Sequence, residues 1–200
     1  MSNKEKYESE IRVPVLNVKQ FLDKLASLKA EKTLEYLFHD HCYKPVGASA
    51  QDWDPARKIM RIREWKYPTT YSQILFTKTR TIDLMGIKFK RTAYPQGKIE
   101  LFRGRKRIAE QLLKDWNFEY WFSIIKSNCV LYKISKPFPF TVALEHVSGI
   151  GYLLEVEIRG GGCDAVAKKI CTALEKLDIP KDSVTSKSTP KLVAEKLGFV

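Results

Sequence analysis

Pairs of like-charged residues two positions apart recur along this chain, and they constrain its fold more than any other feature. The pairs are Glu8 and Glu10, Arg61 and Arg63, Lys88 and Lys90, and Glu155 and Glu157. Apolar residues alternate with them, as Ile62 does between the two arginines. Because the side chains of a strand alternate between its two faces, both members of a pair share one face. The pattern predicts strands with one apolar and one charged face.

The same alternation along the whole chain predicts eight strands. They span residues 7–16, 34–44, 57–65, 71–81, 87–94, 118–134, 140–147 and 152–159. Apolar stripes at helical spacing predict four helices, over residues 18–30, 103–116, 164–177 and 188–198. Strands and helices do not alternate as in a parallel βαβ sheet, so we expect an α+β fold with a mainly antiparallel sheet. A chain of this length is expected to form a single domain, residues 1–200.

The charge balance indicates an anionic partner. The chain has 35 Lys and Arg residues against 23 Asp and Glu, a formal net charge of +12. If the charged strand faces lie on the outside of an open sheet, they are simply solvated. If the sheet closes on itself, the basic rows converge to bind a polyphosphate, and the carboxylates bind the divalent cations that accompany it. Periodicity alone leaves both interpretations open.

A basic cluster and a pair of histidines each allow a structural interpretation as well as a functional one. Lys98 and the run Arg103–Arg107 form the strongest basic cluster, which is typical of a solvated helix face. An RNA contact is the alternative, although no RNP-like or KH-like motif accompanies the run. His39 and His41 share a strand face next to Asp40, but two histidines without distant partners are typical of surface or packing residues.

Several classes of protein lack support in the sequence. No apolar run is long enough for a membrane helix, and residues 1–10 contain no apolar segment of a secretory signal. The four cysteines have no metal-site spacing, which favours a reducing, cytoplasmic location. The chain contains no P-loop, nucleophile elbow or HExxH motif.

Five segments resemble, in order, motifs of the CYTH superfamily. These proteins are the triphosphate tunnel metalloenzymes, which include class IV adenylyl cyclases, thiamine triphosphatases and inorganic tripolyphosphatases. The segments are Glu8–Arg12 (ESEIR, for ExExK), Met60–Arg63 (MRIR, for LRIR), Leu75–Lys78 (LFTK, for LTxK), Lys126 (for KxR) and Leu144–Glu157 (LEHVSGIGYLLEVE, for LDxVxGLGxFxEIE). The last segment is the most specific, because it combines a glycine turn with two acids on one strand face.

The resemblance implies an eight-stranded antiparallel β-barrel with flanking helices around a charged tunnel. It implies that a Mg²⁺ or Mn²⁺ ion is bound by Glu8, Glu10, Glu155 and Glu157. It also implies a triphosphate held by Arg12, Arg61, Arg63, Lys78 and Lys126, with Lys90 or Arg91 in the place of a further family arginine. The first motif supplies the expected catalytic residues Glu8, Glu10 and Arg12, and Asp40 is expected near the tunnel mouth.

The chain departs from the family pattern in three places. Arg12 replaces a lysine; it still binds phosphate, but it cannot act as a general base because it keeps its proton near neutral pH. Residues 90–94 (KRTAY) lack the two carboxylates of the family's RxExE strand. Lys126 is followed by Ser127 and Asn128, so the arginine of the KxR pair is missing.

The expected function is a metal-dependent triphosphatase that hydrolyses tripolyphosphate or a nucleoside or thiamine triphosphate. Within the same fold, the alternative is a class IV adenylyl cyclase that converts ATP to cyclic AMP and pyrophosphate. A non-catalytic barrel that binds polyphosphate or RNA ends is a third hypothesis. A small triphosphate is therefore the expected partner, whereas the oligomeric state, a homodimer included, stays open.

Overall fold

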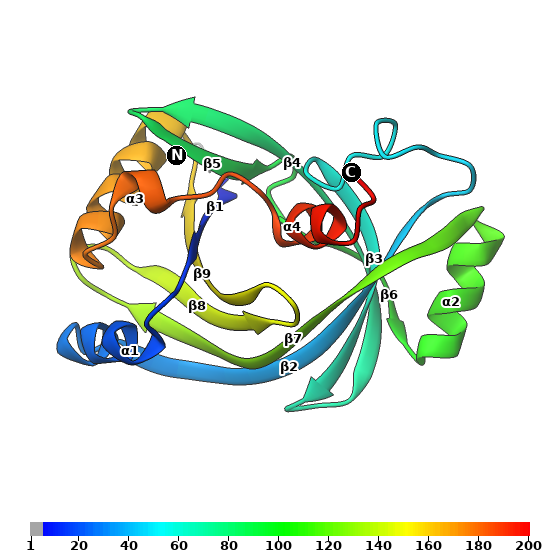
Figure 1. Ribbon diagram of the computed structural model, residues 1–200, viewed down its shortest axis with the longest axis horizontal. Coiled ribbons are helices and arrows are strands. Elements are labelled where there is room, and N and C mark those ends of the chain that lie inside the picture. Colours follow the sequence, from blue (N-terminus) through cyan, green and yellow to red (C-terminus); the bar gives the residue numbers. More distant parts are fainter. Residues whose placement is uncertain (1–5) are drawn as a thin grey trace, which may run out of the picture.

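The computed structural model describes residues 6–200 and contains, within them, one nine-stranded sheet with four flanking α-helices (Figure 1). The strands are β1 (Tyr7–Pro14), β2 (Glu31–Pro45), β3 (Lys58–Tyr67), β4 (Tyr71–Leu84), β5 (Ile87–Thr92), β6 (Ile99–Gly104), β7 (Phe118–Ile134), β8 (Phe140–Val147) and β9 (Gly151–Gly160). The helices are α1 (Val18–Ser27), α2 (Lys106–Asp115), α3 (Cys163–Lys176) and α4 (Thr189–Lys196), with a 3-10 turn at Lys181–Ser183.

The sheet closes on itself through strand β4. Its order is β3-β2-β7-β8-β9-β1-β5-β4-β6, the neighbouring strands are antiparallel, and β3 also pairs with β4. The first part of β4 pairs with β3, whereas Thr79–Leu84 pair with β5. Eight strands thus form a ring, and β6 pairs with the first part of β4. In Figure 1 the long strands β2 and β7 form one side of this ring, and β4 and β5 lie on the opposite side.

The outer face of the ring is apolar and covered by helices. One core cluster joins α1 and α3 to strands β1, β5, β8 and β9, and a second joins α2 to β3 and β4. Ile62, between the two arginines of β3, is fully buried in the second cluster, and Val156, between Glu155 and Glu157, lies in the first. The apolar faces predicted from the alternation therefore point outward, and the charged faces point into the ring.

Helix α4 closes one end of the ring. Its Val193 and Ala194 are buried in a cluster with apolar side chains of five strands, namely Cys42, Ile59, Phe122, Ile124, Val147 and Leu153. The helix begins where the sequence predicts, because the Ser188 hydroxyl accepts a hydrogen bond from the N–H of Lys191 (3.3 Å) and Pro190 lies in the first turn. The ring interior is consequently apolar at this end and charged beyond it.

The predicted α+β fold, an antiparallel sheet closed around a tunnel, is confirmed with two differences. The described chain has nine strands instead of eight, because residues 99–104 form β6, and the helix predicted from residue 103 begins at Lys106. The six residues of β6 pair with β4 alone, so this short strand depends on a tertiary partner that local periodicity does not reveal. Between residues 6 and 200, no helix is both long and apolar enough to span a membrane.

Because α4 closes the ring with apolar side chains, we expect a charge introduced on its apolar face to destabilise the protein strongly. Val193→Asp would place an unpaired carboxylate in the closing cluster, so we expect the free energy of unfolding to fall by about 3 kcal/mol. Leu197→Asp is the matched control, because Leu197 is 53% exposed at the end of the same helix. Urea denaturation measures both variants; equal, small losses would show that α4 is not a structural plug.

Candidate active site

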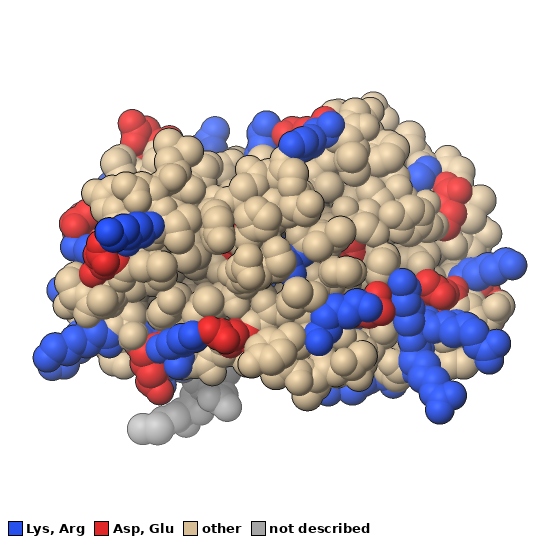
Figure 2. Space-filling view, turned by 60° about the horizontal axis from the view of Figure 1, so that its bottom comes forward, with Lys and Arg blue, Asp and Glu red and all other residues tan. Residues whose placement is uncertain are grey.

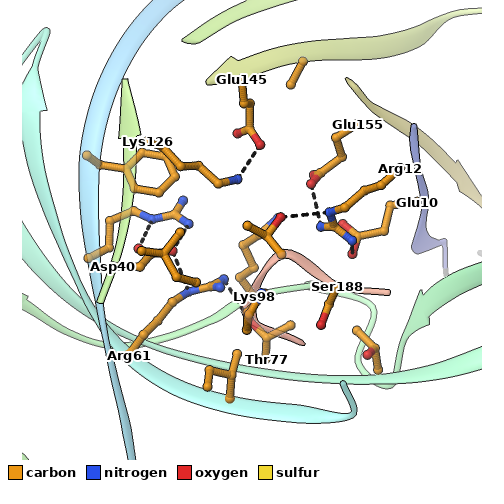
Figure 3. Close-up of a pocket in the computed structure, with 18 of the residues that line it drawn as sticks. Glu10, Arg12, Asp40, Arg61, Thr77, Lys98, Lys126, Glu145, Glu155 and Ser188 are labelled. Carbon is orange, nitrogen blue, oxygen red and sulfur yellow. Dashed lines mark hydrogen bonds and ion pairs between the residues drawn. The ribbon is translucent and has the colours of Figure 1, made fainter. Parts of the chain in front are cut away.

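A charged cavity of about 230 Å³ lies inside the ring (Figure 3). Seven basic side chains line it: Arg12, Arg57, Lys58, Arg61, Arg63, Lys98 and Lys126. Six acidic side chains also line it: Glu8, Glu10, Asp40, Glu145, Glu155 and Glu157. Buried charges are costly unless they are paired, so the arrangement of these thirteen groups determines what the cavity can bind.

Strands β1 and β9 form an acidic wall, which comprises Glu8, Glu10, Glu155 and Glu157. Antiparallel pairing sets Glu10 opposite Glu157 and Arg12 opposite Glu155. The guanidinium of Arg12 lies between two of these carboxylates, 2.9 Å from Glu10 and 2.6 Å from Glu155. Burial would raise the pKa of Glu155, but Arg12, Lys126 and Lys98 together outweigh burial and hold that pKa well below its usual range. Arg12, the nearest of these cations, thus helps to keep Glu155 ionised.

The rest of the acidic wall carries more negative charge than its basic neighbours neutralise. Lys98 lies 2.9 Å from Glu8, and Arg159 lies 3.4 Å from Glu8 and 3.3 Å from Glu157. Burial, followed by the negative charge of Glu8, nevertheless raises the pKa of Glu157 to about 7. Burial likewise raises the pKa of Glu10, although Arg12 opposes it. Additional positive charge at this wall would stabilise the ionised carboxylates.

A basic wall faces the acidic one, on β3 and β7 (Figure 3). It comprises Arg61, Arg63 and Lys126. Arg63 donates two hydrogen bonds to Asp40, at 2.8 and 2.9 Å, and Lys126 pairs with Glu145. Burial would raise the pKa of Asp40, but Arg63 and Arg61 lower it to about 2. Asp40 is thereby kept as an anion that orients both arginines.

Arg61 has unused hydrogen-bonding capacity. One terminal nitrogen donates to the Thr77 hydroxyl at 3.2 Å, and Nε lies 3.5 Å from an Asp40 oxygen without hydrogen-bond geometry. This Nε is buried and has no hydrogen-bond partner within residues 6–200. A buried, unsatisfied guanidinium nitrogen in a cavity is a feature that an anionic ligand would complete.

The structure brings together most of the predicted site residues. Eight of them line the cavity: Glu8, Glu10, Arg12, Arg61, Arg63, Lys126, Glu155 and Glu157. Asp40, expected near the tunnel mouth, lines the same cavity but is buried within it, between Arg61 and Arg63.

Strand register distinguishes Lys90 from Arg91. Lys90 lies opposite Glu10 and shares the inward face with it. The Lys90 Nζ donates to the carbonyl of Ala56, and Lys90 does not itself line the cavity. Arg91 lies opposite Ser9 on the other face, where it donates to the Gly160 carbonyl at 3.1 Å and lies over the Tyr7 ring. Arg91 therefore has a structural environment, and Lys90 is the residue that points towards the site.

Lys78 lies outside the group, contrary to the expectation from the motif. On β4, Thr77 and Thr79 are the side chains that line the cavity. Because side chains alternate along a strand, the intervening Lys78 points to the outer surface. Lys78 is exposed and lines a separate surface groove with Asp52 and Lys191. It has no position from which to contact a ligand held between Arg61 and Arg63.

The sequence patterns did not predict four charged residues that line the cavity, namely Arg57, Lys58, Lys98 and Glu145. The sequence places Lys98 in a basic surface cluster, but the turn before β6 brings it to Glu8. Gly97, with φ of +79°, permits this approach, since a Cβ there would lie 2.7 Å from a Glu8 oxygen. Glu145 belongs to the recognised segment 144–157, and only the contact with Lys126 shows its role.

His39, His41 and the basic run Arg103–Arg107 lie apart from the cavity. His41 lies 3.2 Å from Glu64 and 3.0 Å from the Ser123 hydroxyl, and neither histidine lines the cavity. Figure 2 shows Lys and Arg side chains interspersed with acidic ones at the end of the molecule that carries α2. Arg103 pairs with Glu100 there, and Lys106 with Glu64 and Glu110, so part of this basic cluster is neutralised locally.

The acidic wall fits a divalent cation by the chemistry of its donors. Its four carboxylates supply only oxygen ligands, which Mg²⁺ and Mn²⁺ prefer. Within residues 6–200, no three Asp, Glu, His or Cys side chains are already grouped to hold a metal. Arg12 and Lys98 occupy the space between the carboxylates, so a cation would bind there by rearranging these ion pairs.

Comparisons with solved structures identify the class of fold. The chain is similar to the PH1012 protein of Pyrococcus horikoshii (TM-score 0.70, 20% identity, 92% of this chain and 98% of that one). It is also similar to a proposed adenylate cyclase of Vibrio parahaemolyticus (TM-score 0.67, 15% identity, 94% and 98%). A third relative in fold is the proposed adenylyl cyclase HpAC1 of Hippeastrum, described as having a dominant triphosphatase activity (TM-score 0.62, 15% identity, 98% and 97%).

These similarities extend over nearly the whole of each chain and show a shared fold. No protein-family model matches the sequence, and no curated protein matches it. The class of fold that these structures share with the chain is thus the closed antiparallel sheet with its flanking helices.

The ion pairs of Asp40 predict a measurable pH dependence of stability. Its pKa falls from 3.8 to about 2 on folding, so its stabilising effect is complete above pH 4 and is lost as the pH falls towards 2. Asp40→Asn leaves Arg61 and Arg63 without their anion, so we expect the free energy of unfolding at pH 7 to fall by about 3 kcal/mol. Denaturation between pH 2 and 7 should also show a smaller acid dependence than in the wild type. Asp83→Asn, at a largely exposed position, serves as control; the same pH profile in wild type and Asp40→Asn would contradict this assignment.

Proposed function

We propose that this protein is a metal-dependent triphosphatase of the CYTH type, which acts on a triphosphate held inside the ring. The observation that carries the proposal is the division of the cavity into a basic wall, with an unsatisfied Arg61 nitrogen, and an acidic wall opposite. Such a cavity can bind a phosphate chain on one side and its accompanying cations on the other. The motif resemblance and the similarity to structures named for cyclase and triphosphatase activities support it.

In this proposal the basic wall orients the phosphate chain. Arg61 and Arg63 donate to phosphate oxygens as planar forks, and Lys126 adds a third positive charge. Asp40 and Glu145 fix these side chains before a ligand arrives, so little reorganisation is needed as negative charge develops in the transition state. The bond between the terminal phosphorus and its bridging oxygen is broken by an attacking water.

The acidic wall holds the cation and accepts the proton. Glu8, Glu10, Glu155 and Glu157 are the proposed ligands of Mg²⁺ or Mn²⁺, which supplies Lewis-acid stabilisation of the phosphoryl oxygens when bound. A carboxylate of this wall accepts the proton of the attacking water. Arg12 cannot, because Glu10 and Glu155 outweigh its burial and raise its already high pKa. Arg12 instead holds Glu155 and contacts phosphate.

An adenylyl cyclase is the second candidate. Two of the similar structures carry cyclase names, and one of these is also described as a dominant triphosphatase. Cyclisation would use the same phosphate and cation sites but would require the ribose 3′-hydroxyl of ATP as nucleophile in place of water.

The product mixture distinguishes the candidates. Purified protein is incubated with tripolyphosphate, ATP or thiamine triphosphate, each with Mg²⁺, Mn²⁺ or EDTA, and phosphate, pyrophosphate and cyclic AMP are measured. We expect metal-dependent release of phosphate that EDTA abolishes. Cyclic AMP with pyrophosphate would establish the cyclase, and binding without any product would establish a non-catalytic polyphosphate-binding protein.

The basic wall predicts a strong effect of Arg61→Ala. Loss of a preorganised donor to the phosphate chain should lower kcat/KM by about 100-fold. Lys78→Ala removes a cation from the outer surface of the neighbouring strand and should leave kcat/KM unchanged. Steady-state phosphate release measures both variants, and circular dichroism checks their folding. Equal losses in the two variants would mean that the cavity does not hold the substrate.

A further inference from the structure

A second group of reactive side chains lies on the outer face of the ring, apart from the charged cavity. His41 follows Asp40 on β2, and because Asp40 lines the cavity, alternation places His41 on the opposite face. Antiparallel pairing sets His41 directly opposite Ser123 of β7, and Glu64 lies on β3, the other neighbour of β2. The fold thus brings to His41 one partner from each neighbouring strand.

His41 connects a serine hydroxyl to a carboxylate. Its Nδ1 lies 3.0 Å from Ser123 Oγ, and its Nε2 lies 3.2 Å from an oxygen of Glu64. An ionised carboxylate can only accept hydrogen bonds, so Nε2 carries the proton and Nδ1 of the neutral ring is the acceptor. Ser123 then donates its hydroxyl proton to Nδ1. This is the arrangement in which a histidine activates a serine as a nucleophile.

Two lysines keep Glu64 in the ionised form that this arrangement requires. Lys66 Nζ lies 2.6 Å from one Glu64 oxygen, and Lys106 Nζ lies 3.4 Å from the other, which also faces His41. Burial would raise the pKa of Glu64, but the hydrogen bonds from Lys66 and His41 and the charge of Lys106 lower it to about 2. The side chains of His41 and Glu64 are only 16% and 18% exposed, so their neighbours restrict both of them.

The serine has a further hydrogen-bond donor beside it. The Tyr120 hydroxyl lies 3.0 Å from Ser123 Oγ, and because the serine proton is directed to His41, the tyrosine is the donor in this contact. Tyr120 is an exposed residue and Ser123 is half-buried, so a small molecule can approach the hydroxyl from solvent. When Ser123 attacks a carbonyl group, the Tyr120 hydroxyl is within reach of the oxygen that becomes negatively charged.

We propose that Ser123, His41 and Glu64 form a nucleophilic triad that hydrolyses small carboxylic esters at the outer face of the ring. Ser123 Oγ attacks the carbonyl carbon while its proton passes to His41 Nδ1, and Tyr120 donates to the carbonyl oxygen. The bond to the leaving alcohol oxygen then breaks, and the alcohol takes the proton from His41. A water molecule attacks the acylated serine, again with its proton passing to His41, and the carboxylic acid leaves as the Ser123 hydroxyl is restored. One ester and one water thus give one acid and one alcohol.

A second pair of serine and histidine provides an internal control. Ser127 Oγ, four residues further along β7, lies 3.1 Å from Nδ1 of His146. None of the ion pairs formed within residues 6–200 involves His146, whose ring packs on Tyr152 with centroids 5.0 Å apart. Ser127 therefore contacts the same histidine nitrogen at a similar distance but lacks the carboxylate that fixes the tautomer.

Labelling with a fluorophosphonate, followed by mass spectrometry, tests the triad, because an activated serine displaces fluoride from this reagent. We expect Ser123 to be modified and Ser127 to stay unmodified. His41→Gln and Glu64→Gln should each lower the labelling rate by about 100-fold, since each removes a part of the general base. Ser127→Ala is the matched control and should leave the rate unchanged. Circular dichroism checks folding, and Glu64→Gln decides if His41→Gln does not fold.

Turnover of p-nitrophenyl acetate tests the hydrolysis itself. We expect continuous release of p-nitrophenol that Ser123→Ala abolishes and EDTA leaves unchanged, which separates this reaction from the proposed metal-dependent triphosphatase. Equal labelling of Ser123 and Ser127, or labelling rates that His41→Gln and Glu64→Gln do not alter, would overturn the triad. Labelling of Ser123 without turnover of the ester would overturn the proposed hydrolysis.

Discussion

The structure depends on how charged side chains are accommodated inside a closed ring of strands. Thirteen of them line the cavity, and the buried ones, such as Arg12, Asp40 and Arg61, would each be costly to bury alone. Cross-strand register provides the partners, because Arg12 faces Glu155 across β1 and β9, and Arg63 faces Asp40 across β2 and β3. The two walls are therefore consequences of strand pairing, and a shift of one residue in either pair of strands would turn the charges outward.

Arg12 also connects this charged interior to the C-terminal segment. Its carbonyl accepts from the N–H of Thr185 at 2.8 Å, and its Nε donates to the Thr189 hydroxyl at 3.1 Å. Thr189 begins α4, whose apolar side chains close the ring, and Ser188, Thr189 and Pro190 line the cavity. The same arginine thus positions two acidic side chains and the closing helix, which explains why an arginine with several donors suits this position.

Much of the fold, and most of the charged residues that line the cavity, could be predicted from the sequence. Alternation around Ile62 and Val156 identified which faces are apolar, and the ordered motifs identified two walls of opposite charge. Lys78 was misplaced because both faces of β4 are apolar nearby: Ile74, Leu75 and Phe76 occur in succession, so alternation does not show which face points inward. Lys98 and Glu145 could not be found by periodicity, since their contacts with Glu8 and Lys126 join segments distant in sequence.

A crystal structure of the protein with Mn²⁺ and a non-hydrolysable triphosphate analogue tests the central claim most directly. We expect phosphate oxygens within hydrogen-bond distance of Arg61, Arg63 and Lys126, with Mn²⁺ bound by carboxylates of β1 and β9. Arg61 Nε, which has no hydrogen-bond partner among the described residues, should then donate to the ligand. A ligand bound outside the ring, with the ion pairs of Arg12 and Asp40 unchanged, would show that the cavity is not the triphosphate site.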